Sequence, residues 1–145
     1  MTPEENKTLV RRFFDAFGHN DFAALEAVTH QDVVYHTAPP GLSAGIEGYR
    51  ELMAMYVSAF PDVQITVDDM IAEGDKVVTR FTSRGTQQGE FMGIPPAGTP
   101  VTIGGISIIH VAGNKVAEEW DQLDMLGGLQ QLGATLVPAQ RSATA

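Results

Sequence analysis

Residues 101–121, VTIGGISIIHVAGNKVAEEWD, decide the fold of this chain. Two runs of strand-forming residues flank Ala112-Gly113-Asn114, a sequence typical of a hairpin turn. We therefore predict strands over residues 101–111 and 115–121. The pair Gly104-Gly105 predicts a bend or a bulge in the first strand, because glycine tolerates the dihedral angles that such a feature needs.

A second hairpin precedes this one. Residues 63–73 and 76–87 have the composition of strands, and the turn Glu73-Gly74-Asp75 joins them. Residues 89–100, between the two hairpins, contain three prolines and three glycines, which predicts a loop. The predicted strands are about ten residues long, longer than average, and so they suit a sheet that bends.

Helical patterns occupy the first part of the chain. Thr2-Pro3-Glu4-Glu5 is a capping box with proline at the first helical position, and apolar residues then recur at helical spacing up to Gly18. A shorter helix, capped by Asn20 or Asp21, runs to about residue 28. A third helix spans residues 46–60 and is stopped by the proline that follows.

Helices that come first and strands that come after them predict an α+β fold. Residues 31–36 form a short additional strand, and Asp124 caps a short helix at the C-terminal end. We predict a cone-shaped barrel of three N-terminal helices packed on a strongly curved antiparallel β-sheet. One domain covers residues 1–136, and residues 137–145 form a flexible tail. The mouth of such a cone is a natural site for a small ligand.

The composition excludes several classes of function. Eighteen acidic and nine basic residues give a formal net charge of −9, and the basic residues are scattered, so no nucleic-acid partner is expected. The absence of cysteine removes disulfides, thiolate metal sites and a cysteine nucleophile, and it fits a reducing compartment. No signal-peptide pattern or membrane-spanning apolar run occurs, so we expect a cytoplasmic protein with no membrane partner.

Two sets of apolar residues predict burial against another surface. Phe91, Met92 and Ile94 of the proline-rich loop would be costly to leave in water, and we predict that they fold over the pocket mouth or onto a neighbouring subunit. Residues 101–103 and 106–109 offer β-branched side chains to both faces of the sheet. Because only one face can cover the helices, we predict a homodimer through the outer face.

The stretch of most chemical interest is Glu118-Glu119-Trp120-Asp121, at the end of the last strand. Strand alternation places Glu119 and Asp121 on one face and the other two residues on the opposite face. If the first face lines the cone, Asp121 lies in an apolar setting that suits a general acid/base. The alternative is a solvated strand end with ordinary surface acids. Asp124, by contrast, is explained by helix capping alone.

The four histidines are far apart in sequence and lack metal-ligand spacing, so no metal site is expected. His36 ends a predicted strand before a Pro-Pro-Gly loop, from where a side chain often reaches a pocket. The alternative is a surface or hydrogen-bonded histidine. His110 faces either solvent or the pocket, and a bulge at Asn114 would reverse its direction. Trp120 and Met92 are most simply core or interface residues.

The segments FMGIPPAGTPV (residues 91–101) and GNKVAEEWD (residues 113–121) resemble the SnoaL-like polyketide cyclases of the nuclear-transport-factor-2-like superfamily. The resemblance covers nearly all of residues 4–133 and includes LQQLG at residues 129–133. A weaker similarity lies in the opening helix, at FFDAF (residues 13–17).

This resemblance implies a dimeric cone that acts without a cofactor or a metal. Family cyclases close a ring by intramolecular aldol condensation in an aromatic polyketide ester, with an aspartate on the last strand as acid/base. Asp121 matches the position of that aspartate. The family cyclases pair it with a histidine on the neighbouring strand, and here the matching position is Ser107. A serine can hydrogen-bond a carbonyl group but cannot carry a positive charge.

The leading hypothesis is thus a cofactor-independent, polyketide cyclase-type enzyme that acts on a small apolar carbonyl compound. One alternative is a hydrolase or hydratase of epoxide-hydrolase type, in which Glu119 and Asp121 would act around a water molecule. Another is a non-catalytic module that binds a small ligand and in which Asp121 is structural. The predicted catalytic residues are Asp121 and His36, and the predicted substrate contacts are Ser107, Phe14, Tyr35, Tyr56, Phe60, Met92, Trp120 and Glu119.

Overall fold

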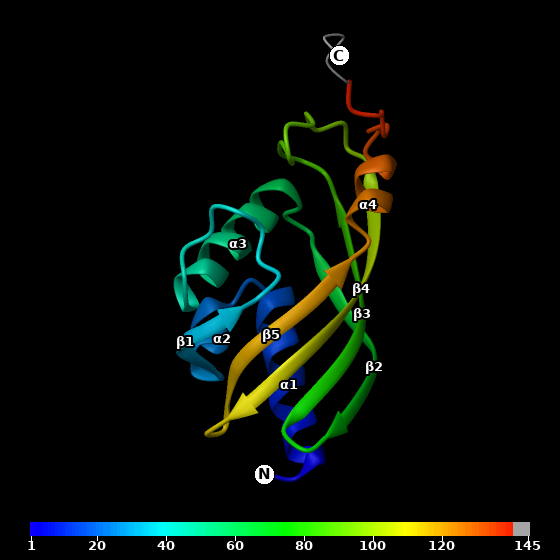
Figure 1. Cartoon of the computed structure of the whole chain (residues 1–145). Helices are drawn as coiled ribbons and strands as arrows, with labels where there is room; N and C mark the ends of the chain where they lie inside the picture. Colours follow the sequence, from blue (N-terminus) through cyan, green and yellow to red (C-terminus); the bar gives the residue numbers. More distant parts are fainter. Residues whose placement is uncertain (141–145) are drawn as a thin grey trace, which may run out of the picture.

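The computed structural model describes residues 1–140 and contains four helices and five strands in that range. Their order confirms the predicted α+β class, because three helices and one short strand precede two long hairpins (Figure 1). The bounds are α1 Pro3–Gly18, α2 Phe22–Ala27, β1 Thr29–Tyr35, α3 Ile46–Ala59, β2 Gln64–Glu73, β3 Lys76–Thr86, β4 Pro100–Ala112, β5 Lys115–Leu123 and α4 Met125–Gln131.

The five strands form one curved sheet in the order β1-β5-β4-β3-β2, and this sheet does not close into a barrel. Strands β2 to β5 pair in antiparallel fashion, as predicted. Strand β1 differs, because it pairs in parallel with β5. The expectation of a wholly antiparallel sheet was therefore wrong at this edge, where a strand from the helical part of the chain completes the sheet.

Capping signals fix the ends of the helices. The Thr2 hydroxyl accepts a hydrogen bond from the Glu5 backbone nitrogen while the Glu5 carboxylate accepts one from the Thr2 nitrogen, so the predicted capping box is present. The side chain of Asp21 caps α2 and that of Asp124 caps α4. Residues 134–140 have no regular secondary structure. Of the predicted tail, residues 141–145 lie outside the described part of the chain.

A β-bulge sets the direction of the side chains on β5. The turn between β4 and β5 has positive φ at both Gly113 (55°) and Asn114 (61°), as a two-residue hairpin turn requires. The ladder then passes from the Val111–Val116 pair to the His110–Glu118 pair and leaves Ala117 without a partner. The bulge is thus at Ala117 and not at Asn114. His110 points to the outer face of the sheet.

The pair Gly104-Gly105 does not form the predicted bulge, because both residues stay in register with β3. Gly105 is required by packing instead. A Cβ atom at this position would lie 2.6 Å from a ring carbon of Phe81 and 2.6 Å from a methyl group of Leu123. The missing side chain therefore makes room for two neighbours on the inner face.

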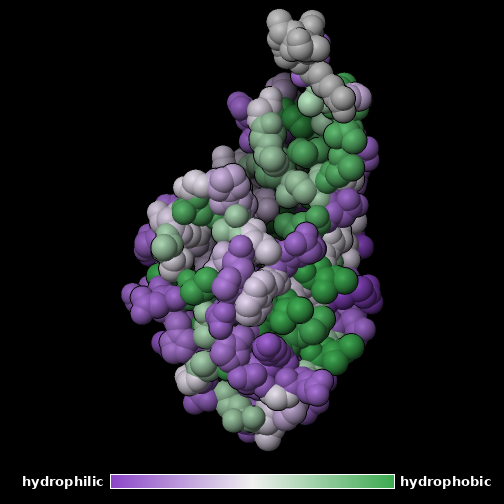
Figure 2. All heavy atoms as spheres, viewed as in Figure 1, coloured by the Kyte–Doolittle hydropathy of each residue, from purple (hydrophilic) through white to green (hydrophobic). Residues whose placement is uncertain are grey.

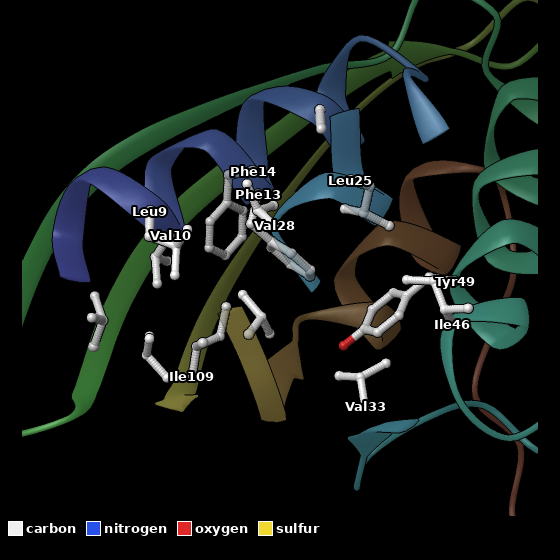
Figure 3. Packing of buried hydrophobic residues seen from close by; sticks show 14 of the residues in the cluster. Leu9, Val10, Phe13, Phe14, Leu25, Val28, Val33, Ile46, Tyr49 and Ile109 are labelled. Carbon is white, nitrogen blue, oxygen red and sulfur yellow. The ribbon is translucent and has the colours of Figure 1, made fainter. Parts of the chain in front are cut away.

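The main core lies between the inner face of the sheet and the helices. Helix α1 runs along this face and contacts β2, β3 and β5. Phe13 and Phe14 of α1 are buried, and Tyr49 extends from α3 with its ring pointing toward the interior (Figure 3). The Phe13 ring meets that of Tyr49 edge to face, with 5.5 Å between centroids. Aromatic side chains thus form much of the inner wall.

A second, smaller cluster joins the long loop between β3 and β4 to the end of α3. Phe91 from the loop is 3% exposed and packs against Phe60 and Tyr56, with ring centroids 5.2 and 6.0 Å apart. The buried Gln87 side chain holds the loop by donating hydrogen bonds to the carbonyl oxygens of Gly89 and Ile94. Of the three apolar residues of this loop, Ile94 is half-buried and only Met92 is exposed.

The outer face of the sheet carries apolar side chains that remain exposed among residues 1–140. Ile106 is 51% exposed and Ile108 is 39% exposed, and both point away from α1. Figure 2 shows apolar and polar side chains together on this face. Within residues 1–140, none of the helices has the length and apolar character needed to cross a membrane.

Candidate active site

An elongated cavity of about 90 Å³ lies between the inner face of the sheet and helices α1 and α3. Its wall is almost entirely apolar, and aromatic rings contribute most of it. The polar groups that reach it are few, and its two acidic side chains both come from β5. The lining residues include Phe13, Phe14, Phe17, Tyr35, Tyr49, Tyr56, Phe81, Leu123, Glu119 and Asp121.

Asp121 lies on the cavity wall, and hydroxyl groups fix both of its carboxylate oxygens. Tyr35 donates a hydrogen bond to Oδ2 at 2.7 Å, and Thr37 donates one to Oδ1 at 2.6 Å. The Thr37 hydroxyl also accepts a hydrogen bond from the backbone nitrogen of Asp121 at 2.9 Å. Both donors come from β1 and the turn after it, because the parallel pairing of Tyr35 with Glu119 brings this segment alongside β5.

Glu119 lies on the same face of β5 and is more deeply enclosed, with 4% of its surface exposed. Tyr49 donates a hydrogen bond to Oε1 and Ser107 donates one to Oε2, both at 2.7 Å. Burial, helped by the negative charge of Asp121, raises the pKa of Glu119 to about 7, although the two hydroxyl contacts act in the opposite direction. We call Glu119 and Asp121 the carboxyl pair.

The two phenols that contact the carboxyl pair support each other. The rings of Tyr35 and Tyr49 stack with 5.2 Å between centroids and 9° between planes. Burial raises the pKa of both hydroxyls well above the ordinary value for tyrosine, and the neighbouring carboxylates add to this effect. Both phenols therefore keep their protons at neutral pH and act as hydrogen-bond donors.

The structure brings five of the ten predicted site residues to the cavity wall, namely Asp121, Glu119, Phe14, Tyr35 and Tyr56. Ser107 is fully buried and reaches the site through Glu119. Phe60 does not line the cavity and belongs to the second core cluster. Met92 is 64% exposed on the long loop. Thr37 was not predicted, because its contact with Asp121 depends on a strand pairing across 84 residues of sequence.

His36 and Trp120 lie on the opposite side of the sheet from the cavity. Their rings stack with 4.3 Å between centroids, and His36 Nε2 lies 2.8 Å from an oxygen of Glu118. Glu118 also contacts His110, which in turn contacts Asp75. Hydrogen bonds from the two histidines lower the pKa of Glu118. The structure therefore does not bring His36 to Asp121, and Trp120, which was predicted to contact substrate, does not line the cavity.

Each of the four oxygens of the carboxyl pair accepts a hydrogen bond from a hydroxyl group, so both side chains are held in a fixed orientation. Within residues 1–140, the side chains form no cluster of three or more histidine, aspartate or glutamate residues suited to a metal ion. An apolar cavity with two carboxyl groups on its wall is suited to proton transfer on a small molecule.

An α+β fold in which helices and a curved sheet form an apolar cavity has the shape of a small-molecule site. This chain belongs to the SnoaL-like polyketide cyclase family, which matches it over residues 7–132. No curated protein matches it closely enough to transfer a more specific description.

Three solved structures from Streptomyces show how far the similarity extends. TsrD from Streptomyces laurentii is 32% identical, with a TM-score of 0.85 and coverage of 93% of this chain and 99% of TsrD. AclR from Streptomyces galilaeus, a candidate hydroxylase, is 31% identical, with a TM-score of 0.81. The match covers 91% of this chain and 98% of AclR. IdmH from Streptomyces antibioticus, a candidate polyketide cyclase, is 32% identical, with a TM-score of 0.79. The match covers 89% of this chain and 99% of IdmH.

Proposed function

We propose that this protein is a cofactor-independent enzyme of polyketide cyclase type, which closes a ring in a small apolar carbonyl compound by intramolecular aldol condensation. Asp121 acts as the general base and acid. The observation that carries the proposal is the position of its carboxylate, which lies on the wall of an apolar cavity with both oxygens held by hydroxyl groups. Membership of the cyclase family supports the same type of reaction.

The reaction starts when Asp121 removes a proton from a carbon between two carbonyl groups of the substrate. The resulting enolate attacks a second carbonyl carbon of the same molecule, which forms the C–C bond and turns that carbonyl oxygen into an oxyanion. In the simplest scheme, the protonated Asp121 then gives its proton to this oxygen. Proton transfer by a positioned side chain contributes about 10²- to 10⁴-fold in rate.

Tyr35 and Thr37 serve as positioning residues in this scheme. Their hydroxyl groups hold the carboxylate in one orientation, so that little motion is needed when a substrate carbon comes within reach. The aromatic wall excludes water from the enolate and offers flat surfaces to an aromatic substrate. The substrate itself supplies much of the reactivity, so one well-placed carboxylate is sufficient.

Comparison of Asp121→Asn with Asp124→Asn tests this proposal. A suitable probe is an aromatic methyl ester with a 3,5-diketo chain, and ring closure is followed by mass spectrometry as the rate above that in buffer alone. Asp121→Asn keeps the size and most hydrogen bonds of the side chain, and the rate is expected to fall by about 10²-fold or more. Asp124→Asn is the matched control, because asparagine caps a helix about as well as aspartate.

Thermal melts of both variants separate chemistry from stability. A melting temperature close to that of the wild type, together with lost turnover, is the expected result for Asp121→Asn. Near-normal ring closure by the Asp121→Asn protein would rule out Asp121 as the acid/base. If this variant bound the probe normally and the wild type itself showed no turnover, a non-catalytic ligand-binding role would replace the enzymatic one.

A further inference from the structure

The reaction described above uses only one member of the carboxyl pair. Glu119 lies two residues before Asp121 on β5, so both side chains leave the strand on the inner face. Glu119 lines the cavity, and hydrogen bonds from Tyr49 and Ser107 hold its two oxygens. These contacts are specific and come from two different elements, α3 and β4. A buried carboxyl group that is held in this way beside a cavity is a candidate catalytic group.

The ionisable groups around Glu119 determine its charge. Asp121 faces it from β5, the phenol of Tyr35 faces it from β1, and that of Tyr49 faces it from α3. The phenol of Tyr56 also lines the cavity and lies near Asp121. Among the described residues that line the cavity, none is lysine, arginine or histidine. Two negative charges on one apolar wall without a cation are unfavourable, so one proton is retained by the pair.

Glu119 is the member that retains this proton, because it is the more enclosed of the two. The Tyr49 phenol keeps its own proton and donates it to Oε1. The proton of a neutral Glu119 therefore resides on Oε2, beside a Ser107 hydroxyl that can accept a hydrogen bond as well as donate one. Burial raises the pKa of Glu119 to about 7, so that the group can both hold and release a proton under neutral conditions.

We propose that Glu119 is the proton donor of this cavity and that it works as a pair with Asp121, the base. This inference rests on the proposed function: it keeps Asp121 as the base and assigns to Glu119 the proton-donor step that the simplest scheme gave to Asp121. Asp121 takes the proton from the substrate carbon, the C–C bond forms, and the oxyanion takes its proton from Glu119, which forms the O–H bond. Asp121 then carries a proton and Glu119 a negative charge. Transfer of one proton from Asp121 to Glu119 restores the starting state.

A titration by nuclear magnetic resonance tests the charge of Glu119 without any substrate. The protein is prepared with glutamate labelled with ¹³C at the side-chain carboxyl carbon, and the Glu119 signal is identified by its loss in Glu119→Gln. We expect the carboxyl group of Glu119 to titrate with a midpoint at a pH of about 7, well above the midpoint of exposed glutamates. Asp121→Asn should lower this midpoint, because it removes the neighbouring charge. Ser107→Ala should raise it, because it removes a hydrogen bond.

These titrations test only whether Glu119 holds a proton at neutral pH, and not whether it donates that proton to a substrate. A Glu119 midpoint in the ordinary range for glutamate, or a midpoint that does not change in Asp121→Asn, would overturn the inference. Neither result depends on whether the protein turns over the probe, so the outcome is independent of the proposed function.

Kinetics with the 3,5-diketo ester in D₂O then separate the two carboxyl groups. Exchange of hydrogen for deuterium at the carbon between the carbonyl groups needs the base, whereas ring closure also needs a proton donor. Asp121→Asn should lower both rates, whereas Glu119→Gln should lower the ratio of ring closure to exchange by about 10²-fold. Glu118→Gln is the matched control, because its side chain lies on the outer face and should affect neither rate.

The rates of the two variants distinguish the role proposed for Glu119 from the role proposed for Asp121. An unchanged ratio in Glu119→Gln, with both rates lost in Asp121→Asn, would overturn the role of Glu119 and leave the proposed function intact. Wild-type exchange in Asp121→Asn would overturn the role of Asp121. In that case, a Glu119 midpoint about 7 and a lost ring closure in Glu119→Gln would still support Glu119 as the proton donor.

Discussion

The substitution Glu119→Gln should change how the stability of the protein depends on pH. The pKa of Glu119 is raised in the folded protein from an ordinary value of 4.5 to about 7. A raised pKa means that the folded state binds the proton more tightly than the unfolded state does. The resulting stability is fully present below pH of about 4.5 and is lost as the pH rises through about 7.

The size of this effect follows from the difference between the two pKa values. A tenfold change in proton affinity corresponds to about 1.4 kcal/mol, so the free energy of unfolding should fall by roughly 3 kcal/mol between these two pH values. Glutamine is neutral at every pH, fits the same space and keeps a hydrogen-bond acceptor for Tyr49. We therefore expect similar stability of the two proteins near pH 4. Above pH 7, Glu119→Gln should be the more stable protein by up to roughly 3 kcal/mol.

Urea unfolding at a series of pH values measures this difference directly. Glu118→Gln provides the control on the same strand, because its pKa is lowered by His36 and His110 on the outer face. Its stabilising contribution is present above pH of about 4.5 and is lost as the pH falls, so this variant should be less stable than the wild type near neutral pH. Parallel pH curves for the wild type and Glu119→Gln would refute the idea that Glu119 is buried in an uncharged form.

Three further predictions concern packing and assembly. Gly105→Ala should lower the free energy of unfolding by about 1–3 kcal/mol, because its Cβ would lie 2.6 Å from two side chains, whereas Gly104→Ala meets nothing within 4 Å and should be nearly neutral in the same urea experiment. Phe91→Ala should cost about 3–5 kcal/mol by thermal or urea unfolding, and Met92→Ala, on the exposed tip of the same loop, should cost less than about 0.5 kcal/mol. Light scattering at micromolar concentration should give the mass of a homodimer for the wild type and that of a monomer for Ile106→Lys, whereas a monomeric wild type would contradict assembly through the outer face.

The elements that the sequence predicts well are those with local signals. The capping box at Thr2 and the cap at Asp124 depend on contacts within three residues, and both occur where the pattern places them. The two hairpins follow from their turns in the same way. Helix and strand ends differ from the predicted ones by only a few residues, because the residues that stop each element are adjacent to it.

The features that were missed depend on contacts between distant parts of the chain. The pairing of β1 with β5 is parallel, and nothing in the sequence of either strand specifies its partner. Thr37 reaches Asp121 only because of this pairing, so a threonine in a turn-rich segment gave no signal of its role. His36, adjacent to it, points to the outer face for the same reason.

The inward direction of Glu119 and Asp121 was predicted only as one of two possibilities, because it depends on the register of the last hairpin. The sequence allowed a bulge at Asn114, but a left-handed conformation there closes the turn without an extra residue. The extra residue lies further along, at Ala117. Alternation along a strand shows which residues share a face, but it does not show which face is the inner one.

The bulge at Ala117 decides which residues of β5 face the cavity. If the same residues paired continuously from the turn, with Ala117 opposite His110, then Glu118 and Trp120 would point inward and the carboxyl pair outward. Loss of Ala117 alone would instead remove the bulge and leave the later pairs, from His110–Glu118 to Ser107–Asp121, in place. Within the family, roles on this strand can therefore be transferred between relatives only by counting residues from the C-terminal end of the strand. A relative whose hairpin is shorter by the bulge residue would keep both acids on the inner face of its sheet.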